Sequence, residues 1–489
     1  MTTLTRILER LARQGLLRGE QLPTGETVIR NVATDSREVE PGTLFCALAG
    51  TTADGHRFLP QVAERGAVAA LVERPVVGVD LRQVPVADGR LAAAHAAGEL
   101  WNDPWNELSL VGITGTNGKT TTAAILRHLL AQRAPAASIG TLGVIGADGE
   151  VVPGSEALTT PGPVDTARWL RRLADDAVTA VAMEVSSHAL HQGRVAAARF
   201  DAAIFTNLSR DHLDYHHTLD AYRASKLRLL ELLKPGAAAI VNAEDPAWAH
   251  VGAERVVRFG GMGDVRAENL RAGAGGMEAT LVVPDGRAAL RIPLFGSYNV
   301  ANTLAAAAAL WTLGWTAEEI GAGLGTLPQV PGRLERVPGP AGVPAVLLDY
   351  AHTPDALERA LAALRPLVRG ELVVVFGAGG DRDPGKRTEM GRVAAAGADR
   401  VIVTSDNPRT EDPDAIADAI ESGMGDAPRL RLLDRREAIR RAILDAGADD
   451  VVLLAGKGHE TYQIWGTEKL PFDEWVIVRA LFAEIQGLS

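Results

Sequence analysis

The sequence GITGTNGKTTT, residues 112–122, constrains the fold of this chain more than any other feature. It follows the apolar run Leu108–Ile113 and leads into a helical stretch from about Thr120 to Leu130. Glycines let backbone N–H groups curl around phosphate oxygens, and the N-terminus of the following helix adds a partial positive charge. A strand, a glycine loop and a helix in this order predict a parallel α/β sheet with a phosphate-binding loop.

The loop also carries the side chains that a nucleoside triphosphate requires. Lys119 can reach the terminal phosphates, and the Thr120 hydroxyl can contact a bound magnesium ion. The common consensus has glycine at position 113, where this chain has Ile113, so the match is to a shorter variant anchored on Gly115. The alternative is a plain glycine-rich turn. We predict that the ATP-binding residues of the loop are Gly115, Thr116, Asn117, Gly118, Lys119, Thr120 and Thr121.

The length of 489 residues predicts about three domains at roughly 150 residues each. The segment Trp101–Trp105 and the Pro and Gly cluster between Pro328 and Pro344 mark the boundaries. Strand-like apolar runs, separated by helical stretches, occur at Val178–Val185, Ala202–Thr206, Ala237–Asn242, Ala345–Asp349, Leu372–Phe376, Val401–Ser405 and Val451–Leu454. We therefore expect an α/β protein of three domains: residues 1–105, a central P-loop, parallel-sheet, ATPase-like domain over 106–334, and a Rossmann-like domain over 335–489.

Composition narrows the classes of partner. The chain has 50 Lys and Arg residues against 61 Asp and Glu residues, a formal net charge of −11, which argues against broad binding of nucleic acid or anionic lipid. The only cysteine, Cys46, cannot form an intrachain disulfide, as is typical of a reducing compartment. Residues 1–20 form an amphipathic pattern without a signal-peptide core, and no stretch is apolar enough to span a membrane. We expect a cytoplasmic protein without nucleic-acid or membrane partners.

Polar side chains follow two of the apolar runs, and these could hold a metal ion. Glu184 ends one run, and Asp211 and His212 follow the next. A carboxylate and an imidazole beside a triphosphate could bind magnesium, whereas the alternative is that His212 or His188 is an ordinary loop histidine. From the residues alone, Lys226 in YRASKLRLLELL reads as an exposed helix lysine. A phosphate loop serves hydrolases, kinases, switches and ligases alike, so it does not fix the reaction.

The chain contains, in one order, the motifs GTNGKT, MEVSSH, TNLSRDHLDYH, AYRASK, GSYNVANTLAA, PGRLE, LDYAHTPD, GAGGDRDPGKR, DNPR and GKGHE. In order and spacing this set resembles the Mur ligase family over most of the chain. Within the family it most resembles the members that add meso-2,6-diaminopimelate to UDP-N-acetylmuramoyl-L-alanyl-D-glutamate. The resemblance implies a ligase for peptidoglycan precursor synthesis that uses ATP and Mg²⁺, forms an acyl phosphate and is expected to be a monomer.

The resemblance also implies roles for individual residues at the nucleotide. Lys119, Glu184, His212 and Lys226 would be catalytic. Thr120, Glu184, His212 and a carbamylated Lys226 would be metal ligands. A carbamate gives Lys226 the anionic oxygens that Mg²⁺ prefers and that an amine lacks. Asn302, Arg333 and Asp349 would complete the ATP site.

For the UDP-linked substrate, the matching positions are Ser36, Thr159, Thr160, Ser186 and Arg194. Hydroxyl groups and a guanidinium suit phosphate or carboxylate oxygens. Read without the family, Ser36 belongs to a turn before Pro41, and the two threonines to a segment that caps a helix at Val164.

For diaminopimelate, the matching positions are Arg382, Asp406, Asn407, Pro408, Arg409, Gly456 and Glu460. Arg409 can grip a carboxylate with two parallel hydrogen bonds, while Asp406 and Glu460 can receive an ammonium group. Lysine lacks the second carboxylate of diaminopimelate, so a site built around that carboxylate would disfavour lysine. For Arg409 alone, the alternative is a surface ion pair. For the whole protein, the alternatives are a family member that adds lysine, a folate polyglutamate ligase, or a P-loop switch that makes no bond.

Overall fold

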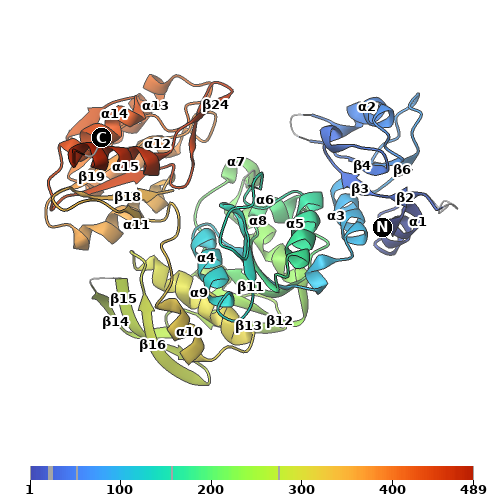
Figure 1. The fold of residues 1–489 in the computed structure, drawn as a ribbon, viewed down its shortest axis with the longest axis horizontal. Helices are drawn as coiled ribbons and strands as arrows, with labels where there is room; N and C mark the ends of the chain where they lie inside the picture. The colour runs from blue at the N-terminus through green and yellow to red at the C-terminus, as the bar shows by residue number, and fades with distance from the viewer. Residues whose placement is uncertain (1, 20–25, 51–52, 156–157, 274–275, 488–489) are drawn as a thin grey trace. The chain divides into compact units, whose positions relative to one another are not determined.

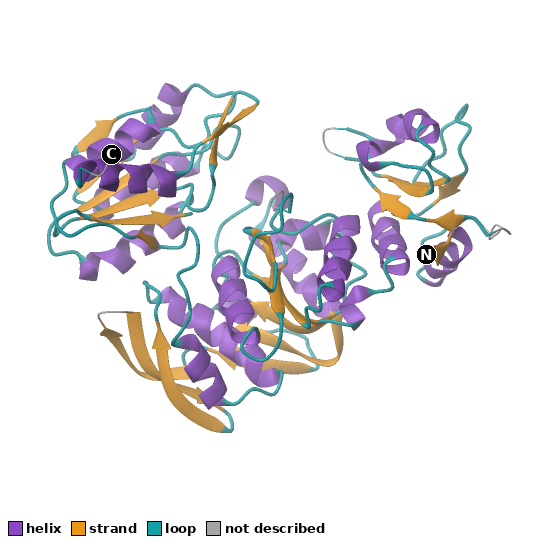
Figure 2. Cartoon of the chain, in the orientation of Figure 1, coloured by secondary structure: helices purple, strands orange, loops and turns teal. Residues whose placement is uncertain are grey.

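The computed structural model describes residues 2–19, 26–50, 53–155, 158–273 and 276–487. These residues form two compact units. Unit 1 comprises Met1–Arg266, Leu281–Ala288 and Asn302–Gly323, and unit 2 comprises Ala267–Thr280, Ala289–Ala301 and Leu324–Ser489. Unit 1 contains two mostly parallel sheets and unit 2 contains one, each with helices against it (Figures 1 and 2).

Unit 1 begins with a small α/β layer. Its first elements are β1 (Thr2–Thr3), α1 (Leu4–Arg13) and β2 (Val28–Ile29), and the two strands pair antiparallel. A four-stranded parallel sheet follows in the order β3 (Asn31–Ala33), β4 (Thr43–Ala47), β5 (Ala69–Val72) and β6 (Gln83–Pro85), with helices α2 (Leu59–Glu64) and α3 (Gly89–Leu100). Leu4, Ile7, Leu8 and Leu11 are buried on one face of α1, as its helical spacing predicts.

The central sheet of unit 1 has seven strands. They are β7 (Ser109–Thr114), β8 (Ala136–Gly140), β9 (Gly143–Ile145), β10 (Ala180–Glu184), β11 (Phe200–Phe205), β12 (Leu233–Asn242) and β13 (Arg255–Phe259). Their order is β13-β12-β11-β7-β10-β8-β9, and all neighbours are parallel except β8 and β9. The helices of this region are α4 (Lys119–Leu130), α5 (Pro163–Asp175), α6 (Ser187–His191), α7 (Leu213–His216) and α8 (Leu219–Leu227).

The three middle strands of this sheet end level with one another. Glu184, the last residue of β10, pairs with Ile113, and Phe205, the last residue of β11, pairs with Thr114, the last residue of β7. The segments that follow these strands therefore meet at the carboxyl edge of the sheet, where α/β proteins bind ligands.

The chain then forms β14 (Arg266–Gly273), β15 (Gly276–Val283) and β16 (Gly286–Ile292), a three-stranded sheet, followed by α9 (Tyr298–Thr312) and α10 (Ala317–Leu324). The two residues Pro284 and Asp285 connect β15 to β16. The Pro-Asp-Gly sequence at 284–286 is typical of such a turn.

The six-stranded sheet of unit 2 consists of β17 (Glu335–Val337), β18 (Ala345–Asp349), β19 (Leu372–Phe376), β20 (Arg400–Val403), β21 (Arg429–Arg431) and β22 (Val451–Ala455). Its order is β17-β18-β22-β19-β20-β21, with only β17 antiparallel to its neighbour. The other elements are α11 (Pro354–Leu364), α12 (Lys386–Gly397), α13 (Pro413–Glu421), α14 (Arg435–Leu444), the hairpin β23 (Tyr462–Trp465) and β24 (Glu468–Pro471), and α15 (Glu474–Ile485).

Both faces of this sheet are covered by apolar side chains. Val374 and Phe376 belong to one buried cluster, and their neighbours Val373 and Val375 belong to another. Because successive side chains of a strand point to opposite faces, the two clusters lie on the two sides of the sheet. This is the doubly wound arrangement expected for a Rossmann-like domain, and the predicted α/β fold class is confirmed.

The predicted boundary at residue 105 lies within unit 1, and unit 2 begins its long segment at Leu324, ahead of the predicted boundary at 334. The three domain ranges remain a prediction. Among the described residues, no helix combines the length and the apolar character needed to cross a bilayer.

Candidate active site

The phosphate loop is shaped by two glycines that hold positive φ angles. Gly115 has φ of 151° and Gly118, the N-cap of α4, has φ of 87°. A Cβ at Gly115 would overlap the Thr206 hydroxyl, and one at Gly118 would overlap the side-chain oxygen of Asn302. The predicted nucleotide residue Asn302 therefore packs directly against the phosphate loop within unit 1.

The segment after β11 fixes the loop backbone. Asn207 accepts from the N–H of Asn117 at 2.9 Å and donates to its carbonyl at 3.1 Å, and Thr206 donates to the same carbonyl at 2.7 Å. Thr116 N–H donates to the Asn207 carbonyl at 2.8 Å. All of these bonds lie within the protein, so they hold the loop backbone in place and lower the cost of ordering it when phosphate binds.

We expect Gly118→Ala to weaken nucleotide binding. The added methyl group would push Asn302 away, and a residue with a Cβ is strained at this φ. The expected result is a rise of about tenfold or more in the Kd for ADP, measured by titration calorimetry. Gly149→Ala serves as the control, since it also has positive φ, 89°, but its Cβ would approach only Arg127, at 3.8 Å. Equal affinity of Gly118→Ala and wild type would contradict this account.

Lys119 begins α4, and its ammonium folds back over the loop. Its Nζ donates to the carbonyl of Gly115 at 3.0 Å and to that of Thr116 at 2.8 Å. The cation is thus held at the concave side of the loop, where phosphate oxygens are expected.

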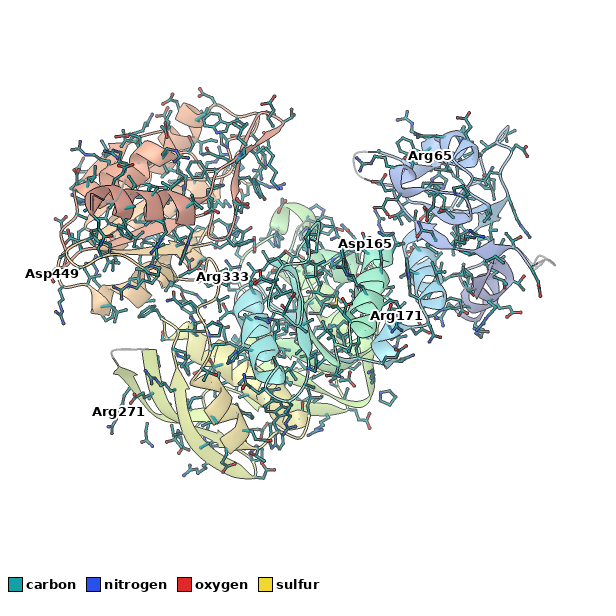
Figure 3. The ribbon with its side chains drawn as sticks, viewed as in Figure 1. Arg65, Asp165, Arg171, Arg271, Arg333 and Asp449 are labelled. Carbon is teal, nitrogen blue, oxygen red and sulfur yellow. The ribbon has the colours of Figure 1, made fainter. Side chains whose placement is uncertain are left out.

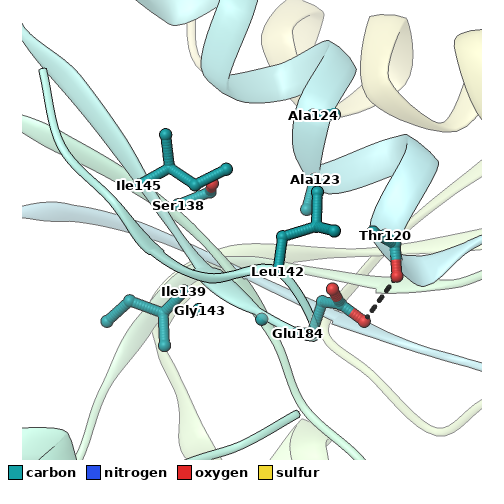
Figure 4. A pocket seen from close by; sticks show the side chains of 10 residues that line it. Thr120, Ala123, Ala124, Ser138, Ile139, Leu142, Gly143, Ile145 and Glu184 are labelled. Carbon is teal, nitrogen blue, oxygen red and sulfur yellow. Dashed lines mark hydrogen bonds between the residues drawn. The ribbon is translucent and has the colours of Figure 1, made fainter. Parts of the chain in front are cut away.

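Glu184 is the buried acid of the site. It is 1% exposed, and its Oε2 accepts from the hydroxyls of Thr120 and Thr141, each at 3.1 Å, while Oε1 accepts from the Thr141 N–H at 2.9 Å. Figure 4 shows Thr120 on the first turn of α4, pointing at Glu184. A carboxylate and a hydroxyl that lie this close together fit Mg²⁺, a hard cation that prefers oxygen ligands.

A small hollow lies beside this pair (Figure 4). Its other walls come from α4, from β8 and from the turn into β9, and are mainly apolar: Ala123, Ala124, Ser138, Ile139, Gly140, Leu142, Gly143 and Ile145. A Cβ at Gly140 would overlap the Glu184 carboxylate. The glycine therefore leaves room for the acid beneath the phosphate loop.

Lys226 contradicts the expectation of an exposed helix lysine. It is 1% exposed, and its Nζ donates to the Gly115 carbonyl at 2.7 Å and lies 4.2 Å from the centre of the Tyr222 ring. Burial, together with the nearby charge of Lys119, lowers the pKa of Lys226 well below its ordinary value. The structure thus places a readily deprotonated amine against the phosphate loop, and a neutral amine is the form that reacts with carbon dioxide.

His212 is partly exposed to solvent, whereas Glu184 is buried. It caps α7 with φ of 53°, its side chain is 45% exposed, and its Nε2 lies 3.4 Å from an oxygen of Asp211. In the part of the chain that the structure describes, no three His, Cys, Asp or Glu side chains converge as a metal site. Thr120 and Glu184 fit one magnesium ion whose remaining ligands would be phosphate oxygens and water, as is usual for Mg²⁺.

Four of the five residues predicted for the UDP-linked substrate lie together. Thr160 donates to the Glu184 carbonyl at 2.9 Å and accepts from the Ser186 N–H at 3.0 Å. Arg194 donates to the Thr160 carbonyl at 3.1 Å, and the Thr159 hydroxyl lies 3.1 Å from that of Thr141. Helix α5 is capped by Gly162 without a side-chain bond, so the threonines do not act as helix caps.

Ser36 lies in a separate part of unit 1. It starts a short 3-10 turn, Ser36–Glu38, that Asp35 caps, which is the local turn that the sequence predicts. Glu38 in this turn forms an ion pair of 3.1 Å with Arg168 of α5, the helix that also carries Asp165, labelled in Figure 3. Among the described residues, no hydrogen bond joins Ser36 to the Thr160 group.

In unit 2, the predicted nucleotide residues Arg333 and Asp349 are neighbours. Asp349 ends β18, and its carboxylate accepts from the N–H groups of Leu334, at 2.7 Å, and Ala351, at 2.9 Å. The Arg333 guanidinium, labelled in Figure 3, lies 4.8 Å from the centre of the Tyr350 ring. Burial raises the pKa of Asp349 to about 6, although Arg333 and both backbone bonds oppose that rise.

This shift predicts how Asp349 changes stability with pH. A carboxyl group whose pKa is raised in the native state stabilises the fold below its ordinary pKa and loses that contribution as the pH rises through about 6. We expect Asp349→Asn to flatten the fall in the free energy of unfolding between about pH 4 and 7, measured by denaturant titration. An unchanged slope would show that Asp349 is not the group responsible.

The residues predicted for diaminopimelate gather at the carboxyl ends of β20 and β22. Asp406, Asn407 and Pro408 are buried, and the Asn407 amide nitrogen donates to Glu460 at 2.9 Å. Arg409 has φ of 53° and donates to the Gly380 carbonyl at 2.7 Å. Arg382 is exposed, and a Cβ at Gly456, where φ is 115°, would overlap the Asp406 carboxylate.

A buried ion pair lies behind these strand ends. Arg435 of α14 and Glu474 of α15 are 0% and 1% exposed, and Arg435 Nε lies 2.7 Å from a Glu474 oxygen. The same guanidinium donates to the Ala455 carbonyl at 2.9 Å and to the Ser405 carbonyl at 3.5 Å. Arg435 therefore braces the residues directly before Asp406 and Gly456.

Comparison with known proteins places this geometry in a family. Three family models match in sequence: the Mur ligase family, catalytic domain, at residues 28–99, the Mur ligase middle domain at 113–310, and the Mur ligase, glutamate ligase domain at 332–458. A UDP-N-acetylmuramoyl-L-alanyl-D-glutamate--2,6-diaminopimelate ligase of Synechococcus elongatus is 44% identical, over 94% of this chain and 95% of the relative. The chain belongs to the Mur ligase family.

Other Mur ligases agree with this assignment. A relative of the same name from Geobacillus kaustophilus is 44% identical over 92% of this chain and 94% of its own. A solved structure with that name is 32% identical, with a TM-score of 0.67 over 99% of this chain and 100% of its own. The fold also matches that of the MurF ligase from Thermotoga maritima in complex with ADP, at 21% identity, a TM-score of 0.65, and coverage of 94% and 99%. The family predicted from the motifs is confirmed.

Sequence reasoning about this Mur ligase missed several residues that hold its site together. Thr141 directly follows the buried strand β8, and Asn207 is the second residue after the buried strand β11, so a polar residue at the end of an apolar run is the signal that could have found them. Lys457 carries the same signal after β22, within a motif of which only two other residues were singled out. Arg435 has no such signal, because it begins an ordinary amphipathic helix.

Proposed function

We propose that this chain catalyses the ATP-dependent formation of an amide bond between UDP-N-acetylmuramoyl-L-alanyl-D-glutamate and meso-2,6-diaminopimelate in peptidoglycan precursor synthesis. Full-length relatives that carry this name support the proposal, at 44% identity. The observation in the structure that carries it furthest is the preformed phosphate loop beside the buried Thr120–Glu184 pair. Such a site holds a triphosphate and a cation at the edge of the sheet where a second substrate can approach.

The proposed reaction has two steps. A carboxylate oxygen of the D-glutamyl residue attacks the γ-phosphorus of ATP, the bond from that phosphorus to the β,γ-bridging oxygen breaks, and an acyl phosphate and ADP form. The free amine of diaminopimelate then attacks the acyl carbon, phosphate leaves, the amine loses a proton and an amide remains. No enzyme nucleophile is needed, because both reacting groups belong to substrates.

Residues of the site have separable proposed roles in the first step. The loop N–H groups and Lys119 offset the charge that develops on the transferred phosphoryl group. Bound Mg²⁺ would supply further neutralisation of the phosphate oxygens. Thr120 and Glu184 would hold one ion, a carbamylated Lys226 would serve a second, and His212 is the further ligand that resemblance to the family implies. Asn302, Arg333 and Asp349 are the proposed further contacts to the nucleotide.

The remaining sites are proposed from the family positions and from their local geometry. Thr159, Thr160, Ser186 and Arg194, together with Ser36, would bind the UDP-linked substrate. The strand ends of unit 2 would bind the amino acid, with Arg409 and Arg382 toward its carboxylate and Asp406 and Glu460 toward its ammonium group. In this scheme, residues 1–105, 106–334 and 335–489 serve the uridine nucleotide, ATP and the amino acid in turn.

A coupled assay of phosphate release tests the proposed function. Wild type should release phosphate only when ATP, the UDP-linked dipeptide and meso-diaminopimelate are all present, and mass spectrometry should show the new amide. Lysine in place of diaminopimelate should give a kcat/KM at least about a hundredfold lower, because Arg409 would lose its carboxylate partner. Phosphate release at the same rate without an amino acid would instead indicate a nucleotide switch.

A further inference from the structure

Lys457 is a buried charged side chain that the proposed mechanism does not use. It is the second residue after β22, in the run LLAGKGHE, and its side chain is 0% exposed. Its Nζ lies 3.1 Å from Asn407 Oδ1, 3.1 Å from Glu460 Oε2 and 3.9 Å from Asp406 Oδ1. Burying an ammonium group is costly unless such partners surround it, so its position is set by the three residues it contacts.

Lys457 and the Ile464 N–H together fix which way the Asn407 amide faces. An ammonium group can only donate, so the oxygen of the amide has to point toward Lys457. The same oxygen also accepts from the Ile464 N–H at 3.0 Å. The amide nitrogen must then face Glu460, to which it donates at 2.9 Å. With Lys457 in place, Asn407 presents a donor and Glu460 presents an acceptor along one side of the subsite.

Lys457 also sets the charge of this subsite. Asp406 and Glu460 carry two negative charges and Lys457 carries one positive charge, which leaves a net single negative charge for a ligand ammonium. The Asp406 side chain is 8% exposed, and in the described part of the chain its closest cation is Lys457, at 3.9 Å. That distance leaves the Asp406 oxygens without a close charge-assisted hydrogen bond, which an ammonium group of the amino acid would supply.

We propose that Lys457 is a positioning residue for the amino-acid subsite, orienting Asn407 and Glu460 to receive the zwitterionic end of a diamino dicarboxylic acid. The inference deepens the proposed function and rests on it. Lys457 itself does not touch the substrate; it acts through the two side chains that do. Its removal should therefore affect amino-acid binding far more than ATP binding or the chemical step.

The test compares Lys457→Gln with Lys469→Gln in the full-length enzyme. Lys469 is the matched control, because it is an exposed lysine of the neighbouring hairpin whose Nζ lies 3.5 Å from the centre of the Tyr462 ring. Lys457→Gln should raise the KM for meso-diaminopimelate by about 10- to 100-fold, the effect of losing charge-assisted hydrogen bonds. Its kcat and its KM for ATP should change by less than about threefold. Lys469→Gln should match wild type in all three constants.

If Lys457→Gln fails to fold, the same substitution can be tested in the Glu460→Gln variant. Glu460→Gln removes the carboxylate that the first substitution leaves unpaired, so the double variant is relieved of that buried charge. The proposal expects Lys457→Gln to add less than about fivefold to the KM of the Glu460→Gln variant, because the two residues act together. An added rise of about tenfold or more would mean that Lys457 acts independently of Glu460, and would overturn the proposal.

Kinetic assays distinguish a failure of the proposed role of Lys457 from a failure of the proposed function. If wild type consumes ATP with diaminopimelate but Lys457→Gln keeps the wild-type KM for that amino acid, Lys457 has no positioning role. Equal rises in the KM for ATP and for diaminopimelate would also overturn the proposal, because they would indicate general damage to the domain. If wild type itself shows no dependence on diaminopimelate, the proposed function is wrong, whatever the behaviour of Lys457.

Discussion

Lys119→Met is expected to lower the rate of phosphate release by about a thousandfold or more. The ammonium of Lys119 is held over the phosphate loop by the carbonyls of Gly115 and Thr116. Removing it leaves the charge that develops on the transferred phosphoryl group without its nearest fixed cation. Methionine keeps an unbranched side chain of similar bulk and removes the charge together with the N–H donors.

The structure predicts that this variant keeps its loop. Asn207 and Thr206 hold the loop backbone through bonds that do not involve Lys119. The affinity for ADP should therefore fall much less than the rate, and the melting temperature should stay close to that of wild type. Lys234→Met is the control, since Lys234 pairs with Asp201 at 2.8 Å at the amino end of the sheet, far along the strands from the loop. Lys119→Met with more than a tenth of wild-type turnover would contradict the assigned role.

Lys226→Met is expected to inactivate the enzyme and, at the same time, to stabilise it. Burial makes the charged amine unfavourable in the native state, so folding must either desolvate that charge or release its proton. The unfolded chain pays neither cost, and methionine removes the difference. We expect a melting temperature higher by about 2 °C or more, seen by calorimetry.

Turnover should fall by about a hundredfold or more in the same variant, because methionine can neither carry a carbamate nor contact the loop carbonyl through an N–H. A surface lysine would behave differently: Lys234→Met loses an ion pair and should be slightly less stable, with normal turnover. Active Lys226→Met protein of lowered stability would show that the buried amine serves only the fold.

Strands β7, β10, β11, β18, β19, β20 and β22 could be predicted because their apolar runs are continuous, whereas shorter or less apolar strands such as β9, β17 and β21 were not predicted. Residues Leu372–Phe376 and Ala345–Asp349 form strands with the predicted bounds. Strand β12 begins at Leu233, ahead of the predicted Ala237. Its true start was missed because Pro235 and Gly236 are untypical of strands. The pairing of β11 with β12 shifts at this point, which lets the strand tolerate a proline. Local sequence does not record such a shift.

Local sequence predicted the phosphate loop of the site but not the buried residues that distant elements bring to it. The phosphate loop follows from local sequence, because its glycines and Lys119 act on the segment that contains them. Lys226 and Lys457 could not be placed from their own segments, since burial depends on which distant elements cover them. The resemblance to Mur ligases singled out Lys226 but left Lys457 unassigned. Pairings such as Asn207 with Asn117 require the sheet order to be known.

The pairing of Arg435 with Glu474 has a consequence for how the enzyme can be altered. Helix α15 carries no recognisable motif, yet its Glu474 neutralises the cation that braces the strand ends proposed to bind the amino acid. A chain shortened before Asp473, or a chimera that borrows its last helix from another source, would leave that cation stranded. Helix α15 is thus linked through this ion pair to the proposed amino-acid site, and we expect the two charged residues to be retained or exchanged only together.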